Sequence, residues 1–229
     1  MPMTRAFSLE CAAVLFDLDG VLVDSGSCVE RTWRGWALQH DLDPVRVIEV
    51  AHGRRTIETV RLVAPQLSAV DEAAALAASE STTTEGVLEV PGARELLQRL
   101  PANAWAIVTS GIRAVATLRI RHTALPMPQV LVCADEIQRG KPDPEGYLTA
   151  ARRLGVAPTA CVVVEDAPAG LEAARAAGMR AIGVSATFAA SELATADHVI
   201  PHLRALHITT VGAGRLLRID GANGTVTPP

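Results

Sequence analysis

The stretch AAVLFDLDGVLVDS, residues 12–25, decides how this chain folds. It opens with an apolar run, residues 12–16, and then presents Asp17 and Asp19 on either side of Leu18. A short apolar run that ends in polar residues and a glycine is typical of a strand buried on both faces. The two aspartates therefore stand where a buried strand is predicted to end.

Further runs of the same kind follow along the chain, and helical patterns lie between most of them. The predicted strands are 12–16, 105–109, 129–133, 161–164 and 180–184. Segments 93–100 and 170–178 have helical periodicity, and Gly178 is suited to end a helix. This alternation predicts an α/β fold with a Rossmann-like parallel sheet and helices on both faces.

The alternation is interrupted once, between the first and second predicted strands. The segments there have helical patterns: 27–40, 44–51, 56–64 and 68–81. We therefore predict a helical domain, residues 25–87, inserted into an α/β core formed by residues 1–24 and 88–229. The tail after about His207 has a weak pattern, which predicts an irregular end.

Composition excludes several classes of protein. The chain has 229 residues, of which 49% are hydrophobic and 20% charged, so a folded core is possible and wholesale disorder is excluded. A formal charge of −4 and an aromatic fraction of 3% predict no nucleic-acid binding, which needs a basic surface and stacking residues.

The cellular location of the protein can also be predicted from its sequence. No apolar run approaches the roughly 20 residues of a membrane span, and acidic residues interrupt the first segment, so we expect neither a membrane anchor nor a secretory leader. The cysteines have no CxxC spacing and predict buried thiols in a reducing compartment. We expect a cytoplasmic monomer.

Polar residues follow four of the predicted strands, at the edge where open α/β sheets bind ligands. They are Asp17 and Asp19 after the first strand, Thr109 and Ser110 after the second, Lys141 some residues after the third, and Glu165 and Asp166 after the fourth. Carboxylates are hard oxygen ligands for Mg²⁺, whereas hydroxyls, backbone N–H groups and a lysine bind phosphoryl oxygens. The set predicts a magnesium and phosphate site.

Each signal taken alone also has a plainer interpretation. Two aspartates separated by one residue also occur on solvated surfaces. Lys141 could be an ordinary surface lysine, and Thr109-Ser110 could be an ordinary helix cap. Their shared position at strand ends favours a site. In addition, Pro142 and Pro144 stiffen the loop that carries the lysine.

The chain resembles the haloacid dehalogenase-like hydrolase superfamily in four motifs, which occur in the expected order: FDLDGVLVDS (16–25), VTSG (108–111), GKPDP (140–144) and VVVEDAPAG (162–170). The resemblance extends to about Phe188, and the inserted helices resemble the small cap of that family. HGRRT (52–56) is similar to the 2-deoxyglucose-6-phosphate and glycerol-3-phosphate phosphatases, with β-phosphoglucomutase a more distant relative.

The resemblance implies a Mg²⁺-dependent phosphatase that hydrolyses a small sugar or polyol phosphate through an aspartyl-phosphate. It implies Asp17 as the nucleophile, Asp19 as the general acid and then base, and Lys141 as the cation that neutralises Asp17 and the phosphate. The metal ligands that it implies are the carboxylates of Asp17 and Asp166 and the backbone carbonyl of Asp19, with Glu165 among the ligands or next to them.

The substrate-binding residues that the resemblance implies come from both parts of the chain: Thr109, Ser110, His52, Gly53 and Arg55. The first two would bind phosphoryl oxygens. The others, from the helical insert, would reach the hydroxyls of the substrate, a small phosphorylated metabolite.

Charge counting also points to a metal. A carboxylate that attacks a phosphate dianion meets like charge, and each unit pair at ~4 Å costs about 4 kcal/mol at an effective dielectric constant of ~20. Lys141 alone cannot offset several such pairs, whereas a divalent cation can.

Two other functions use the same residue types. A sugar phosphomutase would also use Asp17 but would pass the phosphoryl group to a sugar hydroxyl instead of water, and HGRRT favours the phosphatase. A phospho-acceptor receiver domain uses similar residues without catalysing turnover, but its single compact domain has no place for an insert of roughly 60 residues.

Overall fold

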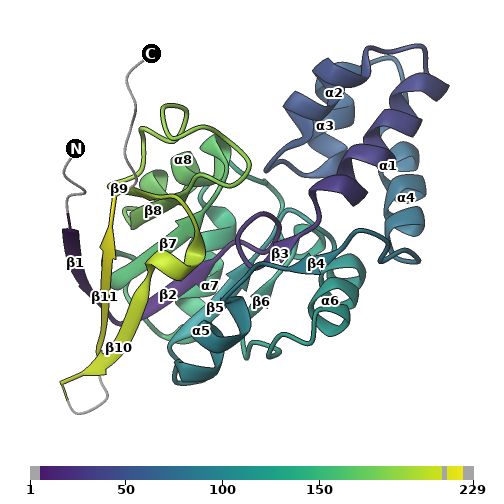
Figure 1. The fold of residues 1–229 in the computed structure, drawn as a ribbon. Coiled ribbons are helices and arrows are strands. Elements are labelled where there is room, and N and C mark those ends of the chain that lie inside the picture. Colours follow the sequence, from purple (N-terminus) through teal and green to yellow (C-terminus); the bar gives the residue numbers. More distant parts are fainter. Residues whose placement is uncertain (1–5, 213–215, 224–229) are drawn as a thin grey trace, which may run out of the picture.

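The computed structural model describes residues 6–212 and 216–223. Six parallel strands form the central sheet in the order β6-β5-β2-β7-β8-β9 (Figure 1). They are β2 (Ala13–Phe16), β5 (Trp105–Val108), β6 (Leu131–Val132), β7 (Cys161–Glu165), β8 (Arg180–Val184) and β9 (His198–Ile200). The predicted parallel α/β fold is confirmed, and the structure adds β9 as an edge strand that the sequence pattern did not indicate.

Side chains of the central strands alternate between two hydrophobic cores. In β2, Val14 and Phe16 belong to one core and Ala13 and Leu15 to the other. Since successive side chains of a strand point to opposite faces, a wholly apolar strand needs helices on both faces. The covering helices are α5 (Ala93–Arg99) and α6 (Arg113–His122) on the first face and α7 (Glu145–Leu154) and α8 (Pro168–Ala176) on the second.

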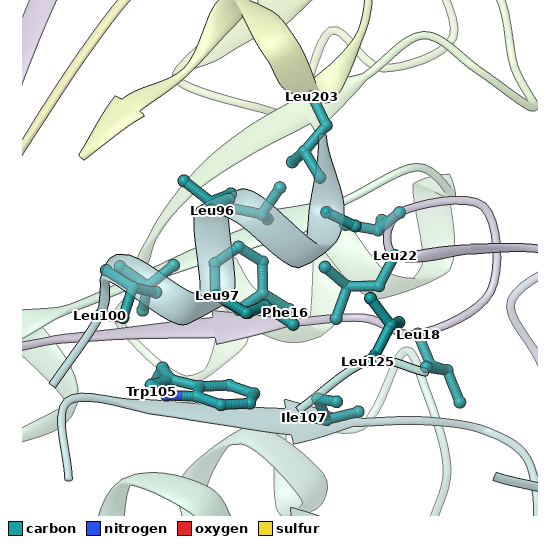
Figure 2. Packing of buried hydrophobic residues seen from close by; sticks show 14 of the residues in the cluster. Phe16, Leu18, Leu22, Leu96, Leu97, Leu100, Trp105, Ile107, Leu125 and Leu203 are labelled. Carbon is teal, nitrogen blue, oxygen red and sulfur yellow. The ribbon is translucent and has the colours of Figure 1, made fainter. Parts of the chain in front are cut away.

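The first of these cores anchors the loop that carries the two aspartates. Figure 2 shows Leu97 of α5 beside Phe16 of β2, with Leu18 and Leu22 in the same cluster. Both loop leucines are fully buried, and burying a leucine side chain contributes roughly 1.5–3 kcal/mol. The burial of these two leucines therefore fixes the backbone that carries Asp17, directly before Leu18, and Asp19, directly after it.

Four helices follow the first central strand, at the positions that the sequence predicts. They are α1 (Gly26–Gln39), α2 (Pro44–Ala51), α3 (Thr56–Val63) and α4 (Ala69–Glu80). These helices, which we call the helical insert, pack around a core of their own that includes Trp33, Trp36 and Leu76. A short antiparallel pair, β3 (Val23–Asp24) and β4 (Leu88–Glu89), joins the insert to the sheet, and Figure 1 shows the helices standing apart from the central sheet.

The prediction of an irregular tail is wrong for its described part. β10 (His207–Val211) and β11 (Leu216–Ala222) form an antiparallel sheet with β1 (Ala6–Cys11), in the order β1-β11-β10. Ile208, Leu217 and Ile219 from this sheet are buried in the same core as α5. One of the two partners of β11, strand β1, lies at the other end of the chain, so local pattern cannot reveal that pairing. Residues 213–215 and 224–229 of the tail lie outside the described residues.

The remaining regular elements are single 3₁₀ turns, at Ala134–Glu136, Pro158–Ala160 and Leu203–Ala205. Within the described parts of the chain, every helix is too short or too polar to cross a membrane.

Candidate active site

A cavity of about 360 Å³ lies between the carboxyl end of the sheet and the helical insert. From the sheet side, its walls include the predicted residues Asp17, Asp19, Thr109, Ser110 and Asp166. From the insert, its walls include Trp33, His52, Gly53, Arg54 and Glu80. The structure therefore brings together side chains that are up to about 150 residues apart in sequence, because parallel strands end at the same edge.

Lys141 lies between two carboxylates beneath this cavity. Its Nζ donates hydrogen bonds to Asp17 Oδ1 at 2.6 Å and to Glu165 Oε1 at 2.5 Å, and its side chain is only 6% exposed. Burial alone would lower the pKa of Lys141, but the two carboxylates raise it well above its ordinary value. The lysine is therefore a permanent positive charge beside Asp17.

Negative charge nevertheless exceeds positive charge here. Carboxylate oxygens of Asp17, Glu165 and Asp166 lie within 4.8 Å of one another, and Lys141 is the ammonium that pairs with two of them. Burial raises the pKa of Asp17 to about 7, with Lys141 opposing the shift and Glu165 adding to it. Burial and the neighbouring carboxylates also raise the pKa of Asp166 well above its usual range.

This imbalance is what a divalent cation would correct. When all three carboxyl groups are ionised, as metal binding requires, one ammonium leaves two negative charges unbalanced, and carboxylate oxygens are hard ligands of the kind that Mg²⁺ prefers. The donor set therefore fits a divalent metal ion.

Glu165 belongs to this cluster, but both of its oxygens are already in use. Oε1 accepts hydrogen bonds from Lys141 and from Tyr147 at 3.1 Å, whereas Oε2 accepts the backbone N–H groups of Asp166 and Ala167 at 2.8 and 2.9 Å. A carboxylate has about four lone-pair sites, so these bonds use its capacity. Of the two positions that the resemblance leaves for Glu165, the hydrogen bonds favour the one next to the ligands.

A glycine makes this arrangement of Glu165 possible. A Cβ added at Gly170, in the first turn of α8, would lie 1.7 Å from Glu165 Oε1. The sequence pattern does not predict this contact, because a glycine in a helix can occur for many reasons besides a close contact.

Replacing Gly170 with alanine is expected to destabilise the fold by about 1–3 kcal/mol, the usual cost of overpacking, and to displace Glu165. Urea unfolding monitored by circular dichroism would measure it. Gly35→Ala, in α1, is the matched control because a Cβ there meets nothing within 4 Å; its stability should stay unchanged or rise by up to about 1 kcal/mol. Equal stabilities of the two variants would contradict the close contact.

Asp19 has two partners that sequence reasoning missed. Its Oδ1 accepts hydrogen bonds from Arg119 Nη1 at 2.7 Å and from Ser25 Oγ at 2.6 Å. Nothing in the sequence separates Arg119 from the neighbouring basic residues of α6. Ser25 ends the first motif, but its spacing from Asp19 alone does not show that the chain folds back onto the carboxylate.

The loop after α2 contacts Ser110, one of the two phosphate-binding candidates. Ser110 Oγ donates a hydrogen bond to the Gly53 carbonyl oxygen at 2.8 Å. The Ser110 hydroxyl is therefore engaged with the helical insert, which leaves its backbone N–H as the group suited to a phosphoryl oxygen. His52 lies on the cavity wall, with its Nδ1 2.7 Å from the Ile48 carbonyl oxygen.

Arg55, for which the resemblance implies a substrate contact, does not lie on the cavity wall. Its guanidinium donates hydrogen bonds to the carbonyl oxygens of Ile137 at 3.0 Å and Gln138 at 2.7 Å, and it pairs with Glu58 at 2.6 Å. Arg55 thus fastens the insert to the loop that precedes Lys141. Adjacent arginines point in different directions here, and it is Arg54 that lines the cavity.

A sequence model of the haloacid dehalogenase-like hydrolases matches residues 11–178 of this chain. Hexitol phosphatase A of Escherichia coli strain K12 is 44% identical over 206 residues, which cover 88% of this chain and 95% of that protein. Glycerol-1-phosphate phosphohydrolase 2 of Saccharomyces cerevisiae is 35% identical over 197 residues, covering 81% and 79%. A solved hydrolase from Pseudomonas syringae has a TM-score of 0.75 at 26% identity and covers 85% of this chain, which covers 94% of it.

Proposed function

Because this chain belongs to the haloacid dehalogenase-like hydrolase family and is a phosphoric monoester hydrolase, we propose that it uses Mg²⁺ and an aspartyl-phosphate to hydrolyse a small sugar or polyol phosphate. The observation that carries the proposal is the buried group of Asp17, Lys141 and Asp166, in which both aspartates line the cavity. Relatives named as a hexitol phosphatase and a glycerol-1-phosphate phosphohydrolase support the class of substrate.

In the first step, a carboxylate oxygen of Asp17 attacks phosphorus and the bond from phosphorus to the ester oxygen breaks. Lys141 offsets part of the negative charge on Asp17 and the phosphate. The Thr109 hydroxyl and the Ser110 backbone N–H bind phosphoryl oxygens. Asp19, protonated at this point, gives its proton to the leaving alkoxide.

In the second step, a water molecule attacks phosphorus and the bond to Asp17 breaks. Asp19, now a carboxylate, accepts the proton of that water, so inorganic phosphate leaves and the Asp17 carboxylate is regenerated. Dividing hydrolysis into two displacements lets one carboxyl group serve first as acid and then as base.

The side chains of Asp17 and Asp166 would hold Mg²⁺ together with the Asp19 backbone carbonyl, and Glu165 would support them from the adjacent position. When bound, the ion supplies the positive charge that lets a carboxylate approach a phosphate dianion.

We also propose that residues 25–87 act as the cap domain over a core of residues 1–24 and 88–229. Trp33, His52 and Arg54 cover the cavity from the insert, so the part of the substrate beyond the phosphate would lie against them. A cover of this kind excludes water and selects the substrate.

A screen of phosphorylated metabolites with Mg²⁺, read as released inorganic phosphate, tests the proposal. We expect turnover of sugar or polyol monoesters. An isomerised sugar phosphate with little free phosphate would indicate a phosphomutase instead, and no phosphate release from any ester would contradict the proposal.

Two neighbouring arginines are expected to differ in their kinetic roles. Arg54→Ala should raise KM about tenfold, the cost of one charged hydrogen bond, because Arg54 lines the cavity. Arg55→Ala should instead lower kcat, by about tenfold, because the loop before Lys141 loses its anchor and small displacements at an active site are costly. Steady-state kinetics separates the two, and an Arg55 variant altered only in KM would contradict the anchoring role.

A further inference from the structure

We propose that Arg119 is a positioning residue that holds Asp19 in its working orientation, and that Glu80 couples this hold to the helical insert. The inference rests on the proposed function, in which Asp19 is the general acid and base.

The contact between Arg119 and Asp19 is short, and the arginine side chain is buried. Nη1 lies 2.7 Å from Asp19 Oδ1, and the arginine side chain is only 5% exposed, whereas that of Asp19 is 27% exposed. Ser25 Oγ donates to the same oxygen at 2.6 Å. Two donors on one oxygen fix the rotation of the carboxyl group, and among the described residues no hydrogen bond engages Oδ2. That second oxygen is therefore the one available for proton transfer.

The same guanidinium reaches the helical insert. Its Nη2 lies 3.4 Å from Oε1 of Glu80, the last residue of α4, whose side chain is 15% exposed. Arginine suits this task because its donors form a rigid planar fork, which can serve two acceptors without reorienting. Arg119 therefore connects a core loop, a core helix and the insert through one side chain.

The other basic residues of α6 do not share this position. Arg113 pairs with Glu136, its side chain is 47% exposed, and it is not on the cavity wall. Arg121 is exposed. A buried guanidinium is costly unless it is paired, so the placement of Arg119 between two carboxylates at the cavity is a specific feature of the site.

The geometry has a kinetic consequence. Asp19 transfers protons and does not bind the phosphate, so loss of its orientation should lower kcat much more than it changes KM. Since a positioned acid or base contributes roughly 10²–10⁴-fold, a misdirected one should forfeit a large part of that factor.

The test measures kcat and KM of the full-length variants Arg119→Met, Arg119→Lys and Arg113→Met and compares them with the wild type. All are assayed with Mg²⁺ on the best substrate of the metabolite screen. We expect Arg119→Met to lower kcat by about 30- to 100-fold with KM within about twofold. Lysine keeps the charge and should restore kcat to within about tenfold of wild type. The Arg113 variant, which makes the same chemical change on the same helix, should keep kcat within about twofold.

A double-variant cycle separates positioning from general support of the fold. If Arg119 acts through Asp19, adding Arg119→Met to Asp19→Asn should slow the enzyme no further. If it only supports the fold, the two losses should multiply. Multiplied losses, a change mainly in KM, or no rescue by lysine would each overturn the inference.

Glu80→Gln carries the test if Arg119→Met does not fold. Glu80→Gln alone should lower kcat by about three- to tenfold. The double variant Glu80→Gln with Arg119→Lys should be no slower than the slower of the two single variants. A Glu80 variant with wild-type kcat would overturn the coupling to the insert. If the wild type releases no phosphate, the proposed function fails. If the wild type is active and Asp17→Asn is inactive, but the losses from Arg119→Met and Asp19→Asn multiply, only the inference about Arg119 fails.

Discussion

Asp17→Asn is expected to abolish turnover while the fold stays intact. Asparagine has nearly the same shape, but its neutral amide is a poor nucleophile and cannot form the acyl phosphate, so kcat should fall on the order of 10⁴-fold or more. Released phosphate measures the activity, and circular dichroism measures the fold. More than a trace of remaining activity would count against Asp17 as the nucleophile.

Stability should move differently from activity in this variant. The cluster around Asp17 holds three carboxylates and one ammonium, so removing one negative charge relieves repulsion, and Lys141 keeps Glu165 as a partner. The midpoint of thermal unfolding should therefore not fall. Asp41→Asn is a suitable control, because Asp41 is exposed, lies outside the cavity and has a φ of 55° that asparagine also adopts readily. It should keep full activity.

Removing divalent metal is expected to stop hydrolysis, and excess Mg²⁺ to restore it. The reason is the unbalanced charge at Asp17 and Asp166, which a phosphate dianion would increase. We expect the rate to fall by at least about 1,000-fold in excess chelator, equivalent to several kcal/mol of lost charge stabilisation. Unchanged rates in excess chelator would refute the charge argument.

A binding measurement makes this prediction independent of catalysis. A cation that binds only the native state raises the midpoint of unfolding with its concentration. Mg²⁺ should therefore stabilise the wild type, and Asp166→Asn should need a higher concentration for the same shift, because it loses a carboxylate of the cluster. Equal shifts in both proteins would place the ion elsewhere.

The fold was predictable where the local sequence pattern matches the burial that the element has in the structure. Apolar runs such as 161–164 became fully buried strands, because a parallel sheet with helices on both faces favours apolar side chains along the strand. The carboxylates and the lysine followed from their place after strands, since chain topology alone brings those ends together.

The remainder depends on contacts between distant segments. Arg119 lies 100 residues from its partner Asp19, and β1 pairs with β11 across nearly the whole chain, so neither contact leaves a periodic signal. Arg55 shows a different difficulty: its residue type is right for a substrate contact, but its guanidinium binds two carbonyl oxygens of a core loop, at Ile137 and Gln138.

The ribbon of β3 and β4 brings the two ends of the helical insert side by side. Val23 stands opposite Glu89 and Asp24 opposite Leu88, so the chain leaves and re-enters the sheet region at neighbouring points. A foreign helical bundle of different length, grafted between these strands, would leave the order of the central strands untouched. If the insert acts as the proposed cap, a replacement bundle that keeps the contacts of Arg55 and Glu80 should change the substrate preference while Asp17, Lys141 and Asp166 stay in place.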